Sequence, residues 1–457
     1  MSFLASLALV TTLLPQPPQG GPDGTAAAKG AQGQGLLTPA ERAGLRDKLV
    51  KYLVEDAAYS LSTGKEREKA SKAAEKARNA FTDDWSKAEK KGALASMADL
   101  RAIFENCFAL KNPSISLAQL RAEKTKGSDL EYSFYLPKNY KATTPSRTLW
   151  VLPGTADAKG DAWTKPADYF AATWDKSATS ADTIFHLPLA RQGIEFDPVP
   201  DFSREASANE EQSRIDWMWG SFAELIWAYN IERSKLFLDC GRGNCGFGLR
   251  FVTMFPDRFA GVVLRAPVAV DDIRLGSLRD LPVLLVRTAA SAEVVDALSK
   301  RLQEIGAKPT TIDAKDEYPH KGHTTDIEAW MADKRRTAVP SRVVIEPNHD
   351  KFNQAYWADI EVADSLVTAQ PDKKPRLECE ADRAANRITV KAVGIERFTL
   401  FLNDDLVDLD KEFTVVINDK AVTEKKTRNF RDLRERMIKR RDWEFLFPVA
   451  FTSNVPK

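Results

Sequence analysis

Residues 235–267 read KLFLDCGRGNCGFGLRFVTMFPDRFAGVVLRAP, and this stretch decides the fold. It opens on a short apolar run, passes through a glycine-rich turn and continues with apolar residues at helical spacing. After the segment FPDRF it enters a second apolar run, GVVL. Short apolar runs bounded by turn residues indicate buried strands. A strand, a tight turn, a helix and another strand form a crossover unit, which is typical of a parallel sheet.

The same alternation extends over residues 126–335. Short apolar runs are separated there by helix-length segments, which favours an α/β domain with a mostly parallel sheet and flanking helices. The predicted strands are residues 132–136, 149–152, 183–187, 236–238, 261–264 and 283–286. Apolar residues at helical spacing over 215–229 predict a helix directly before the strand at 236.

Several segments of this domain resemble the α/β-hydrolase superfamily, especially secreted esterases and peptidases of the polyhydroxybutyrate-depolymerase and feruloyl-esterase type. The turn at 241–245 is similar to the family's nucleophile elbow, and residues 149–155 (LWVLPGT) resemble its oxyanion loop. Residues 281–287 (LPVLLVR) match the strand before the catalytic acid, and residues 318–323 (YPHKGH) match the loop of the catalytic histidine. The resemblance implies that Gly154 and Thr155 form the oxyanion loop and that His323 is the base.

The turn itself lacks a nucleophile in either alignment with the family. Counting from Pro256 places the nucleophile position at Arg242, and counting from Gly241 places it at Gly243. A guanidinium offers no lone pair for attack on a carbonyl, and glycine has no side chain. The acid position falls near Ser291 or Ala292, with Glu293 as the nearest carboxylate. The resemblance therefore implies a hydrolase fold with a degenerate catalytic triad.

Two residues remain as candidates for nucleophilic attack: Cys245 and, more weakly, Thr155, beside which the sequence indicates no base. A helix N-terminus lowers the pKa of a thiol, so thiolate chemistry is conceivable at Cys245. The alternative is a small buried side chain, which the following turn of helix would point away from the elbow. A disulfide between Cys240 and Cys245 is a further alternative, although bridging across a tight turn demands particular geometry.

Regions of different character flank the α/β domain. Residues 1–35 read as a signal-like apolar segment and a flexible Pro/Gly-rich linker, which predicts an extracytoplasmic location. Residues 36–125 have helical patterning. Residues 340–457 are rich in strand-like runs and predict a β-rich accessory domain. One basic helix is predicted at 428–441, with arginines that form a solvated face and local ion pairs.

The composition excludes several classes of function. The chain has 457 residues with 66 Lys+Arg and 65 Asp+Glu, a net charge of +1, so no basic face for nucleic acid is predicted. Its 4 cysteines lack the spacing of a zinc site, and the 4 histidines form no ligand set. The glycines around 241–248 are explained better by the hydrolase turn than by a dinucleotide loop. We expect no metal and no cofactor.

Three hypotheses remain for the function. The first is an exported, non-catalytic hydrolase-fold protein, whose cleft binds a small-molecule ester, peptide or carboxylate, binds a partner, or only supports the scaffold. A guanidinium at Arg242 fits a carboxylate ligand. The second is an active ester or peptide hydrolase with a displaced nucleophile, His323 as base and Glu293 as acid. The third is an envelope or assembly protein that binds a protein partner through residues 340–457.

Overall fold

The computed structural model describes residues 35–456 apart from 106, 108–112, 126–130, 155–165, 189–204, 271, 367 and 441. The signal-like segment predicted over residues 1–35 therefore lies outside the described residues, except for Gly35. Among the described helices, none has both the length and the apolar character needed to cross a membrane.

The central element of the described chain is a sheet in the order β1-β2-β4-β3-β5-β6-β7-β8. β1 and β2 pair antiparallel, β2 also pairs antiparallel with β4, and all other neighbours are parallel. This arrangement confirms the predicted α/β-hydrolase fold class. The strands are β1 (Leu120–Lys124), β2 (Glu131–Tyr135), β3 (Ser146–Leu152), β4 (Thr183–Pro188), β5 (Ile231–Gly241), β6 (Gly261–Arg265), β7 (Val283–Arg287) and β8 (Thr310–Asp313).

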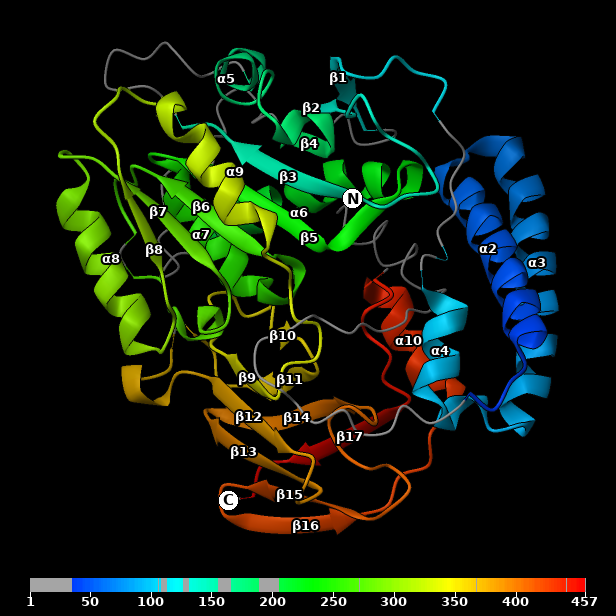
Figure 1. Cartoon of the computed structure of the whole chain (residues 1–457). Coiled ribbons are helices and arrows are strands. Elements are labelled where there is room, and N and C mark those ends of the chain that lie inside the picture. The colour runs from blue at the N-terminus through cyan, green and yellow to red at the C-terminus, as the bar shows by residue number, and fades with distance from the viewer. Residues whose placement is uncertain are drawn as a thin grey trace.

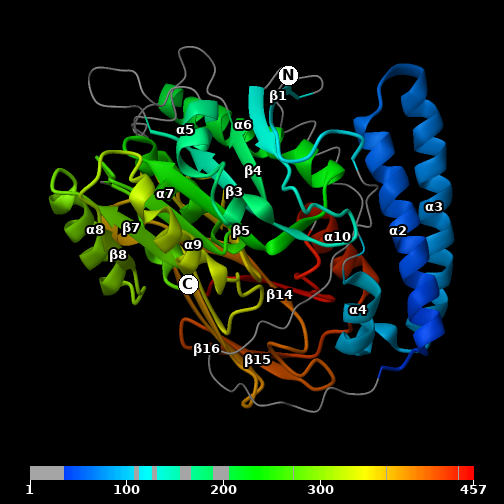
Figure 2. The ribbon, with the colours of Figure 1, turned by 45° about the horizontal axis from the view of Figure 1, so that its top comes forward.

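Helices cover both faces of this sheet because its central strands are apolar on both sides (Figures 1 and 2). Alternate strand residues such as Trp150 and Leu238 pack with α6 (Glu205–Ala228), α7 (Asn244–Met254) and α8 (Ala292–Glu304). The intervening residues, such as Val151 and Phe237, pack with α5 (Pro166–Thr173) and α9 (Thr324–Ala332).

A helical layer lies beside the sheet (Figure 1). It contains α2 (Pro39–Leu61), α3 (Gly64–Lys90), α4 (Met97–Phe104) and, from the far end of the chain, α10 (Phe430–Arg440). α2 begins with a capping box in which Thr38 and Glu41 exchange hydrogen bonds. β1 lies within the segment 36–125 that the pattern presents as helical, but it pairs with the α/β sheet.

The remaining strands form two sheets that share one apolar core. One has the order β10-β11-β14-β17 and the other β16-β15-β13-β12-β9. Their bounds are β9 (Arg342–Ile345), β10 (Gln354–Ala355), β11 (Ala358–Ala363), β12 (Arg376–Asp382), β13 (Arg387–Val393), β14 (Ile395–Leu402), β15 (Phe413–Ile417), β16 (Lys420–Glu424) and β17 (Val449–Asn454). The strand-like runs of the sequence thus predicted correctly that this region is rich in β-strands.

The prediction that the arginines of the basic helix form a solvated face was wrong for two of them. Arg428, just before α10, pairs with Asp404 at 2.7 Å, as local ion pairing predicts. Arg436 and Arg440 are instead 3% and 6% exposed. The reason is tertiary: Arg440 pairs with Asp257, which lies far away in the sequence.

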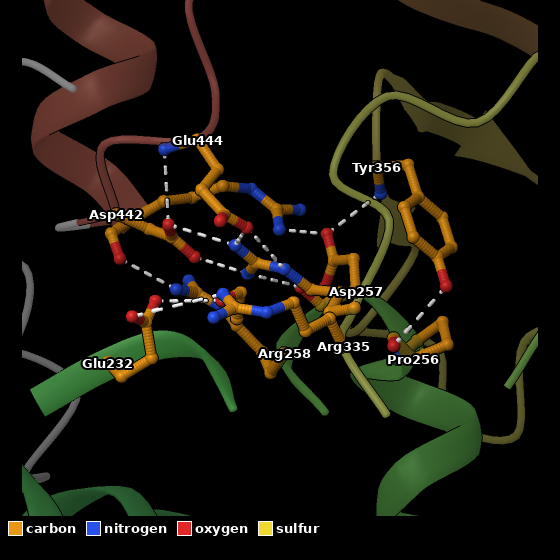
Figure 3. A network of polar contacts seen from close by, with 11 residues as sticks. Glu232, Pro256, Asp257, Arg258, Arg335, Tyr356, Asp442 and Glu444 are labelled. Carbon is orange, nitrogen blue, oxygen red and sulfur yellow. Dashed lines mark hydrogen bonds and ion pairs between the residues drawn. The ribbon is translucent and has the colours of Figure 1, made fainter. Parts of the chain in front are cut away.

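Arg440 belongs to a polar junction where the α/β sheet, the segment after α9 and the C-terminal segment meet (Figure 3). Arg336 donates to Asp442 Oδ1 at 3.0 Å and to Glu444 Oε2 at 3.1 Å. It also donates to the carbonyl oxygen of Asp257 at 2.8 Å. Because Arg336, Asp442 and Glu444 are 5%, 1% and 5% exposed, these contacts are shielded from water.

The junction predicts a pH-dependent stability. Burial raises the pKa of Glu444 from its ordinary 4.5 to about 7, so the folded state holds a proton that the unfolded chain releases. This contribution is fully present below pH 4.5 and is lost as the pH rises through 7. Across that pH range, the free energy of unfolding of the wild type should fall by on the order of 3 kcal/mol relative to that of Glu444→Gln.

Denaturant unfolding at a series of pH values measures this difference. Glu412→Gln, at an exposed position, is the matched control and should follow the wild-type pH profile. Parallel profiles for wild type and Glu444→Gln would contradict the prediction.

Candidate functional site

The turn between β5 and α7 is the strained feature at the carboxyl edge of the sheet. Arg242 follows β5 directly and has φ +46°, in the left-handed region that non-glycine residues rarely adopt. Gly243 is already right-handed, with φ −59° and ψ −38°, and α7 begins at Asn244. In hydrolase elbows the strained residue between strand and helix carries the nucleophile. In this turn the strained residue is Arg242 rather than Gly243.

Glycines let the ends of β3 and β5 approach each other at this turn. A Cβ on Gly154 would overlap the carbonyl group of Gly241, and a Cβ on Gly241 would overlap the Tyr318 hydroxyl. The side chain of Asn244 also joins the two segments, by donating to the carbonyl oxygen of Pro153 at 2.6 Å. The loop after β3 is thus held directly against the elbow.

The Tyr318 hydroxyl lies at this close approach. It accepts the backbone N–H of Gly154 at 2.8 Å. That N–H belongs to the loop which, in the hydrolase resemblance, supplies one donor of the oxyanion hole. Burial raises the pKa of Tyr318 above its usual value, so the phenol stays neutral. The backbone N–H of Gly154 is therefore already paired with the Tyr318 side chain.

The guanidinium of Arg242 stacks over the Tyr318 ring, with 5.1 Å between its carbon and the ring centroid. Arg242 itself is partly exposed. A guanidinium so placed can donate to a carboxylate, but it cannot attack a carbonyl carbon.

A buried ion pair fixes the segment that carries Tyr318. Arg265, at the end of β6, donates to both carboxylate oxygens of Asp239 on β5, at 2.8 and 3.1 Å. Its third donor reaches the carbonyl oxygen of Pro319 at 2.8 Å. Asp239 also accepts from Tyr169 at 3.2 Å and from Trp174 at 3.1 Å. The sheet and the loop after β8 are therefore tied together below the elbow.

The histidines of the YPHKGH segment have different environments. His320 is 2% exposed, and its Nδ1 lies 2.8 Å from the carbonyl oxygen of Asp316, which indicates a proton on Nδ1. Burial lowers the pKa of His320, and its Nε2 has no hydrogen-bond partner in the described chain. The His320 ring lies edge-on to Tyr318 with centroids 5.7 Å apart.

His323, the predicted base, faces carboxylates of its own loop and helix. Its Nδ1 lies 2.9 Å from Asp326 and its Nε2 lies 3.8 Å from Asp316. Within the described residues, no hydrogen bond or ion pair joins it to Arg242, Cys245 or Glu293.

Glu293, the proposed acid, is exposed in the first turn of α8. The loop after β7 contains no carboxylate, and Thr288 and Ser291 bond to each other there at 3.0 Å. In the described structure, no hydrogen bond or ion pair joins Glu293 to His320 or His323.

Cys245 is fully buried, and its Sγ lies 3.4 Å from the carbonyl oxygen of Cys240. Both cysteines are free thiols, so the disulfide alternative is not formed. Thr155, the other predicted oxyanion-loop residue, lies outside the described residues. In the described part of the chain, no cluster of three or more His, Cys, Asp or Glu side chains could hold a metal ion.

Sequence reasoning missed Asp239, Arg265 and the position of Tyr318. A signal was present for the first two, because each is a charged residue at the end of an apolar run that reads as a buried strand. Such a charge requires a partner. No pattern indicated where the Tyr318 hydroxyl would lie, since that depends on a contact between residues 154 and 318.

No protein-family model and no curated protein matches this chain. Solved structures show distant similarity. A thermostable esterase is 16% identical with a TM-score of 0.33, over 48% of this chain and 63% of the esterase. An S-formylglutathione hydrolase from Staphylococcus aureus is 13% identical with a TM-score of 0.36, over 48% of this chain and 99% of the hydrolase. A ferulic acid esterase is 10% identical with a TM-score of 0.36, over 47% of this chain and 97% of the esterase.

Proposed function

We propose that this chain is a non-catalytic protein built on an α/β-hydrolase fold. The observation that carries the proposal is Arg242 at the strained turn between β5 and α7, with φ +46°. An elbow holds its central side chain above the sheet so that it can attack. A guanidinium in that place leaves nucleophilic catalysis without an attacking atom.

The use of Gly154 by Tyr318 supports the same proposal. Oxyanion stabilisation requires donors that point at empty space where the charge develops. Here the Gly154 N–H donates to the Tyr318 hydroxyl at 2.8 Å, so a substrate oxygen would have to displace it. Because Cys245 is fully buried and Glu293 is exposed on another helix, neither supplies the missing groups in this arrangement.

Labelling with an active-site probe tests the proposal. We expect intact-mass analysis after incubation with a fluorophosphonate, and separately with a thiol-reactive ester analogue, to show no stoichiometric adduct. An active serine esterase is the positive control, and circular dichroism verifies that the sample is folded. A single adduct at one residue, abolished by His323→Ala or His320→Ala, would overturn the proposal.

Arg242→Ser is an informative second sample. It supplies a hydroxyl at the elbow but leaves the bond between Gly154 and Tyr318 in place. We expect it to remain unlabelled as well, since a nucleophile needs a base within hydrogen-bond reach.

A further inference from the structure

The segment between α10 and β17 has no regular secondary structure, yet all of residues 442–448 are buried. We call residues 442–448 the junction strap. Its apolar side chains enter two different cores. Trp443 and Leu446 belong to the core of the helical layer. Phe445 and Phe447 belong to the core that the two C-terminal sheets share. The junction strap therefore holds these two parts of the molecule together.

The polar side chains of the junction strap bind the α/β domain through Arg336 (Figure 3). The backbone N–H of Arg336 donates to the carbonyl oxygen of Ser234 on β5 at 2.9 Å. Its guanidinium donates to Asp442 Oδ1 at 3.0 Å and to Glu444 Oε2 at 3.1 Å. The guanidinium carbon also lies 4.9 Å from the centroid of the Phe445 ring. Two carboxylates of the strap thus share one guanidinium of the α/β domain.

The charges that surround these two carboxylates are unequal. Asp442 faces Arg258 as well as Arg336, and both cations favour its ionised form. Glu444 faces Arg336 but also two carboxylates, Asp442 and Glu232, which oppose its ionisation. Of the two side chains, Glu444 is therefore the one that holds a proton.

The remaining charged groups of the junction are paired elsewhere or face Asp442. They come from β5, from η3 (Pro256–Arg258), from the segment after α9 and from α10, and they are Arg233, Asp257, Arg335 and Arg440. Arg440 pairs with Asp257. Arg335 lies 3.9 Å from Glu232. Arg336 is thus the cation that the described contacts give to Glu444.

The protonation of Glu444 changes with pH near neutrality. Burial, together with the neighbouring carboxylates, raises its pKa from the ordinary 4.5 to about 7. Above pH 7 the strap therefore carries two buried negative charges on one guanidinium. Detachment of the strap from Arg336 would place the Glu444 carboxylate in water and relieve this cost. A rise in pH consequently favours the detached form.

We propose that the junction strap is a pH-sensitive connection, which ties the α/β domain to the helical layer and the C-terminal sheets while Glu444 is protonated and opens more often when Glu444 is ionised. The opening is local, because residues 442–448 leave Arg336 while the sheet of the α/β domain stays folded. It differs in this respect from the pH dependence of global unfolding. It is also independent of the proposed loss of catalysis, since no residue of the strap lies at the elbow.

Hydrogen exchange of the full chain at pH 6 and pH 8, followed by mass spectrometry and corrected for the intrinsic exchange rate, tests this proposal. Peptides within residues 442–447 should show an opening equilibrium about 10-fold larger at pH 8 than at pH 6. This factor follows from a pKa of 4.5 for Glu444 in the open strap and of about 7 in the closed one. Peptides from β6, in the core of the sheet, should stay protected at both pH values while the strap exchanges.

Glu444→Gln should lose this pH response, because its amide does not ionise. Glu412→Gln, at an exposed position, is the matched control and should respond like the wild type. The wild-type exchange decides the matter even if Glu444→Gln does not fold. Equal corrected exchange of the wild-type strap at pH 6 and pH 8 overturns the proposal. Exchange of β6 together with the strap, which indicates global unfolding, overturns it too, as does an unchanged pH response in Glu444→Gln.

Discussion

Replacing Arg265 with methionine is expected to destabilise the α/β domain by about 3–5 kcal/mol, the usual cost of removing one partner from a buried ion pair. Arg265 and Asp239 both have fully buried side chains, joined by contacts of 2.8 and 3.1 Å. Without Arg265, the donors that Asp239 keeps among the described residues are the neutral ones of Tyr169 and Trp174. Urea unfolding at neutral pH measures this loss in the free energy of unfolding.

Arg287→Met is the matched control for this prediction. Arg287 also ends a strand and pairs with a carboxylate, Asp296, at 2.9 Å, but the two side chains are 33% and 62% exposed. Exposed pairs contribute at most about 1 kcal/mol, so the control should lose far less stability. Equal losses in Arg265→Met and Arg287→Met would show that burial of the Asp239 pair is not what stabilises this region.

The same variant has a local consequence at the elbow. Arg265 donates to the carbonyl oxygen of Pro319 at 2.8 Å, directly after Tyr318. Its removal should increase hydrogen exchange at Gly154, whose N–H is bonded to the Tyr318 hydroxyl. Unchanged hydrogen exchange at Gly154 would show that the ion pair of Arg265 and Asp239 does not fix the position of Tyr318.

The second large effect is expected from Arg336→Met, with a loss of about 3–5 kcal/mol at neutral pH. This change leaves Asp442 and Glu444 buried together without the guanidinium that lies between them. The loss should be smaller near pH 5. Burial already raises the pKa of Glu444 to about 7, and without Arg336 the carboxyl binds its proton more firmly.

The adjacent Arg335 provides the control for Arg336. Its side chain is 41% exposed, and it pairs with Glu232 at 3.9 Å. Arg335→Met should therefore change the free energy of unfolding by less than about 1 kcal/mol. Unfolding curves in urea at pH 7 and pH 5 compare both variants with the wild type. A pH-independent loss in Arg336→Met would contradict the role given to Glu444.

Prediction from sequence succeeded where the signal was local. The run from Lys235 to Pro267 contains the end of β5, the whole of α7 and the whole of β6, and periodicity alone indicated each element. Strand patterning likewise indicated the β-rich region after 340. It did not assign β1 to the sheet, because the strand sequence LRAEK has only weak apolar alternation. β1 forms a strand because it pairs with β2.

The sequence by itself determined the fold class, through short apolar runs and helical periodicity, and it shows that the turn at 240–245 contains no serine. Only the tertiary structure decided that Arg242 lies at the strained position and that Tyr318 binds Gly154. It also decided that Arg440, which local charge pattern placed in solvent, is buried against Asp257. These contacts join residues more than a hundred positions apart. Hydrogen bonds and ion pairs depend on proximity in space, which periodicity and composition do not encode.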